Sequence, residues 1–181
     1  VNQATALELR GQEAATLHRL AKEVTPGDAD NCEAAAAQYY WPRLFDDKSF
    51  RRTREGPWPN NLLNYGYSVL RAQTARALVA AGLLPALGIF HRNQYNAYPL
   101  ADDLMEPFRS WIDLAVAIHI ETANPNANIS KADKALLLQC AALPARLGKE
   151  KPSLQTALHR ACTSLARCYL GERKRIEYAR L

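Results

Sequence analysis

Apolar residues recur at helical spacing along almost the whole chain, and no segment shows the clean alternation of a half-buried strand. The longest periodic run extends from residue 60 to residue 84, with Gly82 near its end and Pro85 just beyond it. Four consecutive alanines at positions 34–37 give a second segment high helix propensity. We therefore predict an all-α fold.

We expect helices over six stretches: residues 3–24, 30–41, 60–84, 100–122, 131–142 and 153–170. Residues 42–60 are basic and contain several prolines and a glycine, so they are predicted to form a surface loop. A chain of 181 residues lies within the size range of one domain. The predicted organisation is a single helical domain over residues 1–181.

Composition limits the cellular locations in which the protein is expected. Its longest nearly apolar run, residues 77–90, is interrupted by two glycines and a proline and is too short to cross a bilayer. The first residues carry charges throughout and lack the apolar core of a signal peptide. Four scattered cysteines are too few to stabilise a chain of this size by disulfide bonds. We expect reduced thiols, a cytoplasmic location and no membrane partner.

The charge balance permits a polyanionic partner without identifying one. The chain has 23 Lys and Arg against 18 Asp and Glu, which gives a net charge of +5. Several arginines and tyrosines lie close together in sequence, and arginine forks match phosphate oxygens while aromatic rings can stack on bases. For each aromatic residue, core packing is an equally good interpretation. Composition is therefore consistent with phosphate chemistry on nucleic acid, but it does not identify a function more closely.

A few acidic residues and one histidine occupy unusual settings. Glu33 precedes the alanine run, His91 lies in a turn after a glycine, and Asp103 and Glu106 begin the next predicted helix. An acid at a helix N-terminus often does no more than offset the helix dipole. Two carboxylates with one imidazole, however, form a mixed oxygen and nitrogen donor set that suits Mg²⁺ or Mn²⁺. Such a site neutralises phosphate oxygens and activates an oxygen nucleophile.

Three long runs of sequence resemble the CRISPR-associated adaptation integrase family, the Cas-one endonucleases. They are GDADNCEAAAAQYYWPRLF (27–45), NNLLNYGYSVLRAQTARALVAAGLLPALGIFHRNQYN (60–96) and LADDLMEPFR (100–109). The resemblance covers essentially the whole chain and is closest to the type II versions. It implies the family's helical catalytic domain, and it implies that the β-rich domain that precedes it in the family is missing here.

The resemblance also implies a site. Glu33, His91 and Glu106 match the family's three metal ligands, which are also its catalytic residues, and the metal would be Mn²⁺ or Mg²⁺. Asp103 matches a position that carries an acid in some branches, as a supporting or alternative ligand. Other residues expected to support the site are Arg92, Asn93, Arg109 and Tyr67.

The function implied by the resemblance is spacer insertion into a CRISPR array. The 3′-hydroxyl of a captured DNA fragment, the prespacer, would attack a phosphodiester at the edge of the repeat. The implied partners are double-stranded DNA, a second copy of the protein in a homodimer, and the small Cas-two protein. A different hypothesis stays open, in which this chain is a catalytically silent helical module that binds DNA or a partner.

Overall fold

The computed structural model describes residues 1–25, 27–91 and 93–181. These residues form helices and a few isolated β-bridges but no strand, which confirms the predicted all-α fold. The α-helices are α1 (Asn2–Leu9), α2 (Ala15–Glu23), α3 (Cys32–Leu44), α4 (Asn60–Ala80), α5 (Pro99–Met105), α6 (Arg109–His119), α7 (Lys131–Gln139) and α8 (Leu154–Tyr169). Two 3₁₀ turns, η1 (Glu106–Phe108) and η2 (Cys140–Ala142), follow α5 and α7.

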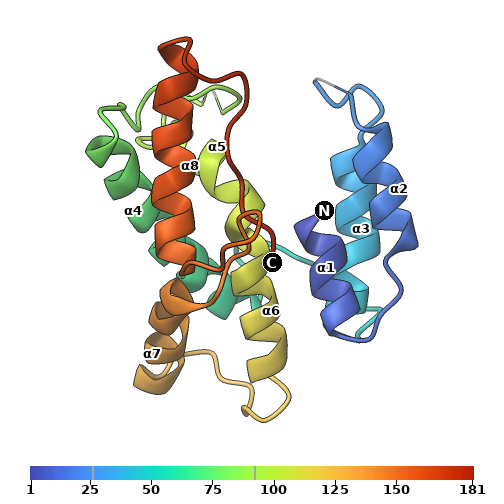
Figure 1. The fold of residues 1–181 in the computed structure, drawn as a ribbon. Helices are drawn as coiled ribbons and strands as arrows, with labels where there is room; N and C mark the ends of the chain where they lie inside the picture. Colours follow the sequence, from blue (N-terminus) through green and yellow to red (C-terminus); the bar gives the residue numbers. More distant parts are fainter. Residues whose placement is uncertain (26, 92) are drawn as a thin grey trace.

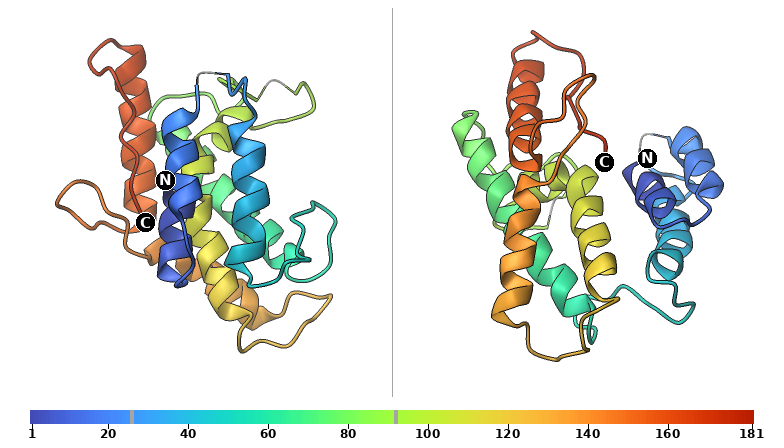
Figure 2. Two further views of the ribbon diagram at one scale, coloured as in Figure 1. Left: turned by 90° about the vertical axis from the view of Figure 1, so that its right-hand side faces the viewer. Right: turned by 60° about the horizontal axis from the view of Figure 1, so that its bottom comes forward.

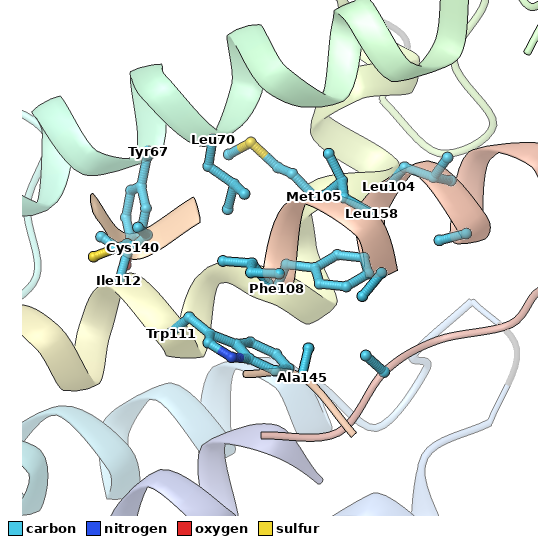
Figure 3. Close-up of a cluster of buried hydrophobic side chains, with 14 of the residues drawn as sticks. Tyr67, Leu70, Leu104, Met105, Phe108, Trp111, Ile112, Cys140, Ala145 and Leu158 are labelled. Carbon is cyan, nitrogen blue, oxygen red and sulfur yellow. The ribbon is translucent and has the colours of Figure 1, made fainter. Parts of the chain in front are cut away.

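The helices form two packed groups that meet along α6. Helices α1, α2 and α3 lie together on one side of the molecule, and α4, α5, α7 and α8 lie on the other (Figures 1 and 2). The larger core contains Phe108 and Trp111, and Figure 3 shows Phe108 near Leu158 of α8 and Trp111 near Ala145. The smaller core joins Leu7 and Tyr40 to the α6 residue Ala117. Both groups therefore bury apolar surface against the same central helix.

The prediction of one helix over residues 3–24 was wrong. Helix α1 ends at Leu9 and α2 begins at Ala15, with Gly11 between them at a φ of +69°. Only glycine adopts this left-handed conformation without steric cost, and it ends a helix readily. The resulting turn lets α1 pack against α6 while α2 packs on α3.

The predicted helix over residues 100–122 is interrupted in its first third. Pro107 has no N–H with which to continue the α-helical ladder, and the chain passes through η1 between α5 and α6. The interruption places Glu106 at the junction of two helices. Proline is less disruptive in α3, which runs through Pro42 to Leu44, so the expected loop begins later than residue 42.

A close approach of α4 to α6 fixes the middle of the molecule. A Cβ atom added at Gly66 would lie 2.4 Å from Cγ2 of Ile112, far inside normal contact distance. The glycine therefore allows the two helices to touch, and it brings Tyr67 of α4 beside Asp113 of α6. This contact becomes important for the site.

The four cysteines are free, three of them buried, as expected for reduced thiols. None of the helices in the described ranges is long and apolar enough to cross a membrane.

Candidate functional site

A groove of about 1900 Å³ is lined by residues of α3, of the α5–α6 junction and of the two loops before α4 and α5. The three predicted metal ligands, Glu33, His91 and Glu106, all line this groove, although they lie far apart in sequence. The other charged residues along it include Lys48, Arg51, Arg52, Asp103, Arg109 and Asp113. The fold thus collects most of the predicted site residues on one surface.

His91 is held in place by Asp103. Its ring Nδ1 lies 2.6 Å from Oδ1 of Asp103, whose side chain is only 4% exposed, while the imidazole is 46% exposed. The same carboxylate accepts backbone N–H groups from Ile89 at 2.5 Å, Phe90 at 3.0 Å and His91 at 3.1 Å. One buried acid therefore orders the whole turn, and it leaves Nε2 of the histidine unengaged by this contact.

The hydrogen bonds also set the charge of Asp103. Burial alone would raise its pKa, but the N–H of Phe90, the His91 ring and the N–H of Ile89 lower the pKa below its usual value. The carboxylate is therefore ionised at neutral pH. An acid that fixes the orientation of a histidine from behind is a common arrangement at metal sites and at acid–base sites.

Gly88 makes the tight turn possible. A Cβ atom at this position would lie 2.3 Å from the backbone oxygen of His91 and 2.7 Å from Cβ of Pro99. The turn that carries the histidine is thus folded against itself and against the start of α5.

Replacing Asp103 with alanine is expected to open this turn. The N–H groups of Ile89, Phe90 and His91 would lose their acceptor, and each lost bond removes about 1 kcal/mol or more. Amide hydrogen exchange at these positions should become roughly tenfold faster or more. The matched control is Asp102→Ala, because Asp102 binds an arginine side chain instead. Equal exchange in wild type and Asp103→Ala would contradict this assignment.

Glu106 is paired with a basic residue of the next turn. Its Oε1 accepts a hydrogen bond of 2.6 Å from Nη1 of Arg109, and the glutamate side chain is 46% exposed. The Arg109 guanidinium lies 4.1 Å from the ring centroid of Tyr67, which positions the charge by a cation–π contact. The nearby negative groups raise the pKa of Arg109 further above its already high value despite its burial. Arg109 is therefore a permanent, oriented cation beside Glu106.

Beneath this pair lies a buried acid that the sequence did not single out. Asp113 is 2% exposed and accepts hydrogen bonds from the hydroxyl groups of Tyr67 and Tyr40, the latter at 3.0 Å. Burial raises the pKa of Asp113 to about 6, although the Tyr67 bond, the Arg109 charge and the Tyr40 bond oppose the rise. This network links α3, α4 and α6 directly below the groove.

Glu33 approaches from the other helical group. It lies exposed in the first turn of α3, where N–H groups of Cys32 and Glu33 donate to the carboxylate of Asp28 at 2.8 and 3.0 Å. Asp28 therefore provides acceptors for the first two N–H groups of α3, while Asn31 is the N-cap residue. Glu33 is left to face the groove from the side opposite the α5–α6 junction.

The remaining predicted residues have different positions. Arg92 lies outside the described residues. Asn93 is exposed and accepts the backbone N–H of Tyr95 at 2.9 Å, so it stabilises its own turn. The carboxylate of Asp102, the residue before Asp103, lies 2.7 Å from Nε of Arg71 and also accepts a hydrogen bond from Asn96. Tyr67 is buried and acts through its hydroxyl and ring contacts.

The donor set fits a hard divalent cation by its chemistry. The groove offers an imidazole with one nitrogen engaged by an acid and two partly exposed carboxylates, which suits Mg²⁺ or Mn²⁺. Across residues 1–25, 27–91 and 93–181, however, no three His, Cys, Asp or Glu side chains converge closely enough to hold a metal ion. The ligand types thus share a groove without forming a closed cage.

Comparison with known proteins identifies relatives of the whole fold. The family described as CRISPR associated protein Cas1 matches residues 3–143. A CRISPR-associated endonuclease Cas1 from Neisseria meningitidis is 46% identical over 122 residues, which are 66% of this chain and 39% of that protein. The endonuclease Cas1 2 from Pyrobaculum aerophilum is 32% identical over 153 residues, 83% of this chain and 52% of that protein.

Solved structures share the fold at lower sequence identity. A Cas1 protein from Thermotoga maritima has a TM-score of 0.77 at 21% identity, covering 95% of this chain and 64% of that one. A casposase bound to an integration product has a TM-score of 0.73 at 21% identity, covering 97% of this chain and 58% of that one. The chain thus spans 39% and 52% of the two endonuclease relatives, and 64% and 58% of the two solved structures.

Proposed function

Because this chain belongs to the CRISPR-associated Cas1 family, we propose that it carries the catalytic site of a metal-dependent DNA endonuclease and integrase. The observation that carries the proposal is the groove in which Asp103 orients His91 near Glu106 and its arginine partner. The named activity of the relatives, endonuclease, agrees with this chemistry.

The proposed reaction is a transesterification on double-stranded DNA. A 3′-hydroxyl at the end of a prespacer attacks the phosphorus of a phosphodiester at the edge of a CRISPR repeat. A new P–O bond forms, the old P–O3′ bond breaks, and the departing strand end leaves as a 3′-hydroxyl. One phosphodiester replaces another, so the step needs no external energy source.

Glu33, His91 and Glu106 would hold the cation. When bound, Mn²⁺ or Mg²⁺ supplies charge neutralisation at a non-bridging phosphate oxygen. The exposed carboxylates of Glu33 and Glu106 and the free Nε2 of His91 are the donors available for it in the groove. Asp103 orients the histidine and stays ionised, so the imidazole keeps its direction toward the groove.

The chain's own cations would bind the DNA. Arg109 is held beside Glu106 by the Tyr67 ring, where it can contact the phosphate that reacts. Lys48, Arg51 and Arg52 line the same groove and would bind backbone phosphates to either side. We propose a second copy in a homodimer and the small Cas-two protein as partners, and we propose a cytoplasmic location.

The test is strand transfer on a branched DNA substrate, with Mn²⁺ or with EDTA. Product is expected with the metal and none with the chelator, because the groove alone leaves the phosphate charge insufficiently neutralised. Mg²⁺ added back should restore the reaction. Product formed equally well in EDTA would overturn the metal dependence.

A second candidate is a silent helical module that binds DNA or a partner protein. One observation favours it: no three ligand side chains converge in the described part of the structure. A folded chain that binds DNA and makes no product with any metal would support this candidate over the enzyme.

A further inference from the structure

Phe90 is a large apolar side chain left in water inside the groove. It lines the groove next to His91, and 76% of its surface is exposed. Leaving a phenylalanine in water rather than burying it is unfavourable for stability. The neighbouring Ile89 is half as exposed, at 37%, so the chain turns the larger ring outward at this point.

The Phe90 ring projects from a fixed backbone. The N–H of Phe90 donates to Asp103 at 3.0 Å, and the N–H groups on either side bind the same carboxylate. The backbone at Gly88 is also packed closely against the backbone oxygen of His91 and against Pro99. The backbone of the turn therefore cannot move toward the core without breaking the bonds that hold His91, and the ring lies along the groove that it lines.

The groove around Phe90 is suited to a nucleic acid. Lys48, Arg51, Arg52 and Arg109 line it and would bind phosphates. A DNA strand held by its phosphates also brings flat, weakly polar bases into the groove, and bases stack favourably on aromatic side chains. An apolar peptide would bring no negative charge to this group of four cations, so a nucleic acid is the better occupant.

We propose that Phe90 stacks on a nucleobase of the bound DNA close to the phosphate that reacts, and so positions the strand beside His91. This inference rests on the proposed function and adds to it a contact with the base instead of the backbone. Because every base has a stacking face, the contact would fix the position of the strand without reading its sequence.

The experiment is a thermodynamic cycle between the side chain and individual bases. Affinity for branched DNA is measured by fluorescence anisotropy with Mg²⁺ for the wild-type chain and for Phe90→Leu, which keeps an apolar side chain without a π face. The bases flanking the branch are replaced one at a time by abasic sites. Phe90→Trp keeps the ring, and Tyr95→Leu is the matched control, since Tyr95 is 87% exposed outside the groove.

We expect Phe90→Leu to weaken binding roughly fivefold to tenfold, with Phe90→Trp close to wild type. At one position, removing the base should weaken wild type by a similar factor and leave Phe90→Leu unaffected, because the two losses are the same contact. Tyr95→Leu should lose affinity at every abasic position as wild type does.

Two outcomes would overturn the inference, and they are distinguishable. If wild type binds DNA and every abasic site costs wild type and Phe90→Leu the same factor, Phe90 does not stack and the proposed function stands. If neither protein binds branched DNA, the proposed function fails together with the inference.

Discussion

Replacing His91 with alanine is expected to lower strand transfer by about 10³-fold. The variant would remove one of the three donors proposed to hold the cation, and the charge stabilisation lost with it is several kcal/mol at a phosphate. His91 is half exposed and its ring contact is to Asp103, so the variant should stay folded. Rates on branched DNA with Mn²⁺ measure the effect, and circular dichroism confirms the fold.

The chain offers a matched control for this variant. His18 is also half exposed, with 45% of its side chain in solvent. Like His91, it has one ring nitrogen close to a carboxylate: its Nε2 lies 2.7 Å from Oε1 of Glu8. It does not line the groove. His18→Ala should therefore react at the wild-type rate, and Asp103→Asn should lose roughly 10–100-fold by misorienting His91. A His91→Ala chain that transfers strands as fast as His18→Ala would remove His91 from the site.

The sequence predicted the fold class because helical spacing of apolar residues is present in every long segment. It predicted the boundaries less well where one residue decides them. An isolated glycine costs only about 1 kcal/mol inside a helix, so Gly11 alone was no reason to divide residues 3–24. Pro107 did signal a break, yet the apolar pattern continues on both sides of it. The positive φ at Gly11 and the 3₁₀ turn η1 depend on how the chain packs on α6. Local sequence patterns do not contain this information.

Residues of the candidate site were identifiable only in part. Glu33, His91 and Glu106 were singled out by residue type and family resemblance, and the structure places all three along one groove. Their roles as ligands stay a prediction. Asp113 was missed because a single acid in the segment RSWIDLAVAIH resembles a solvent-facing residue. A signal was available: Asp113 lies between Ser110 and Val116 on the apolar face of α6, where a charge needs partners.

Asp113 is expected to make the protein less stable as the pH rises from about 4 to about 6. Burial raises the pKa of this carboxyl from 3.8 to about 6 in the folded chain. Between these values the folded state holds more protons than the unfolded state, so the free energy of unfolding falls with increasing pH. Its contribution should decrease by about 3 kcal/mol across the window, since each pKa unit corresponds to about 1.4 kcal/mol.

Comparison of wild type with Asp113→Asn isolates the contribution of Asp113 to the free energy of unfolding. Asparagine keeps an acceptor for the Tyr40 or Tyr67 hydroxyl but does not titrate. Urea unfolding at pH 4.5, 5, 6 and 7 should show the variant gaining roughly 2 kcal/mol relative to wild type as the pH rises, because the rest of the change lies below pH 4.5. Asp47→Asn is the control with the opposite sign, because hydrogen bonds from Ser49 lower the pKa of Asp47. Its titration is confined to below about pH 4, so its difference from wild type should stay constant from pH 5 to 7. A constant difference for Asp113→Asn as well would mean that the buried carboxylate is fully compensated by Arg109 and the two tyrosines. The network would then be a rigid, permanently charged base for the groove instead of a titrating one.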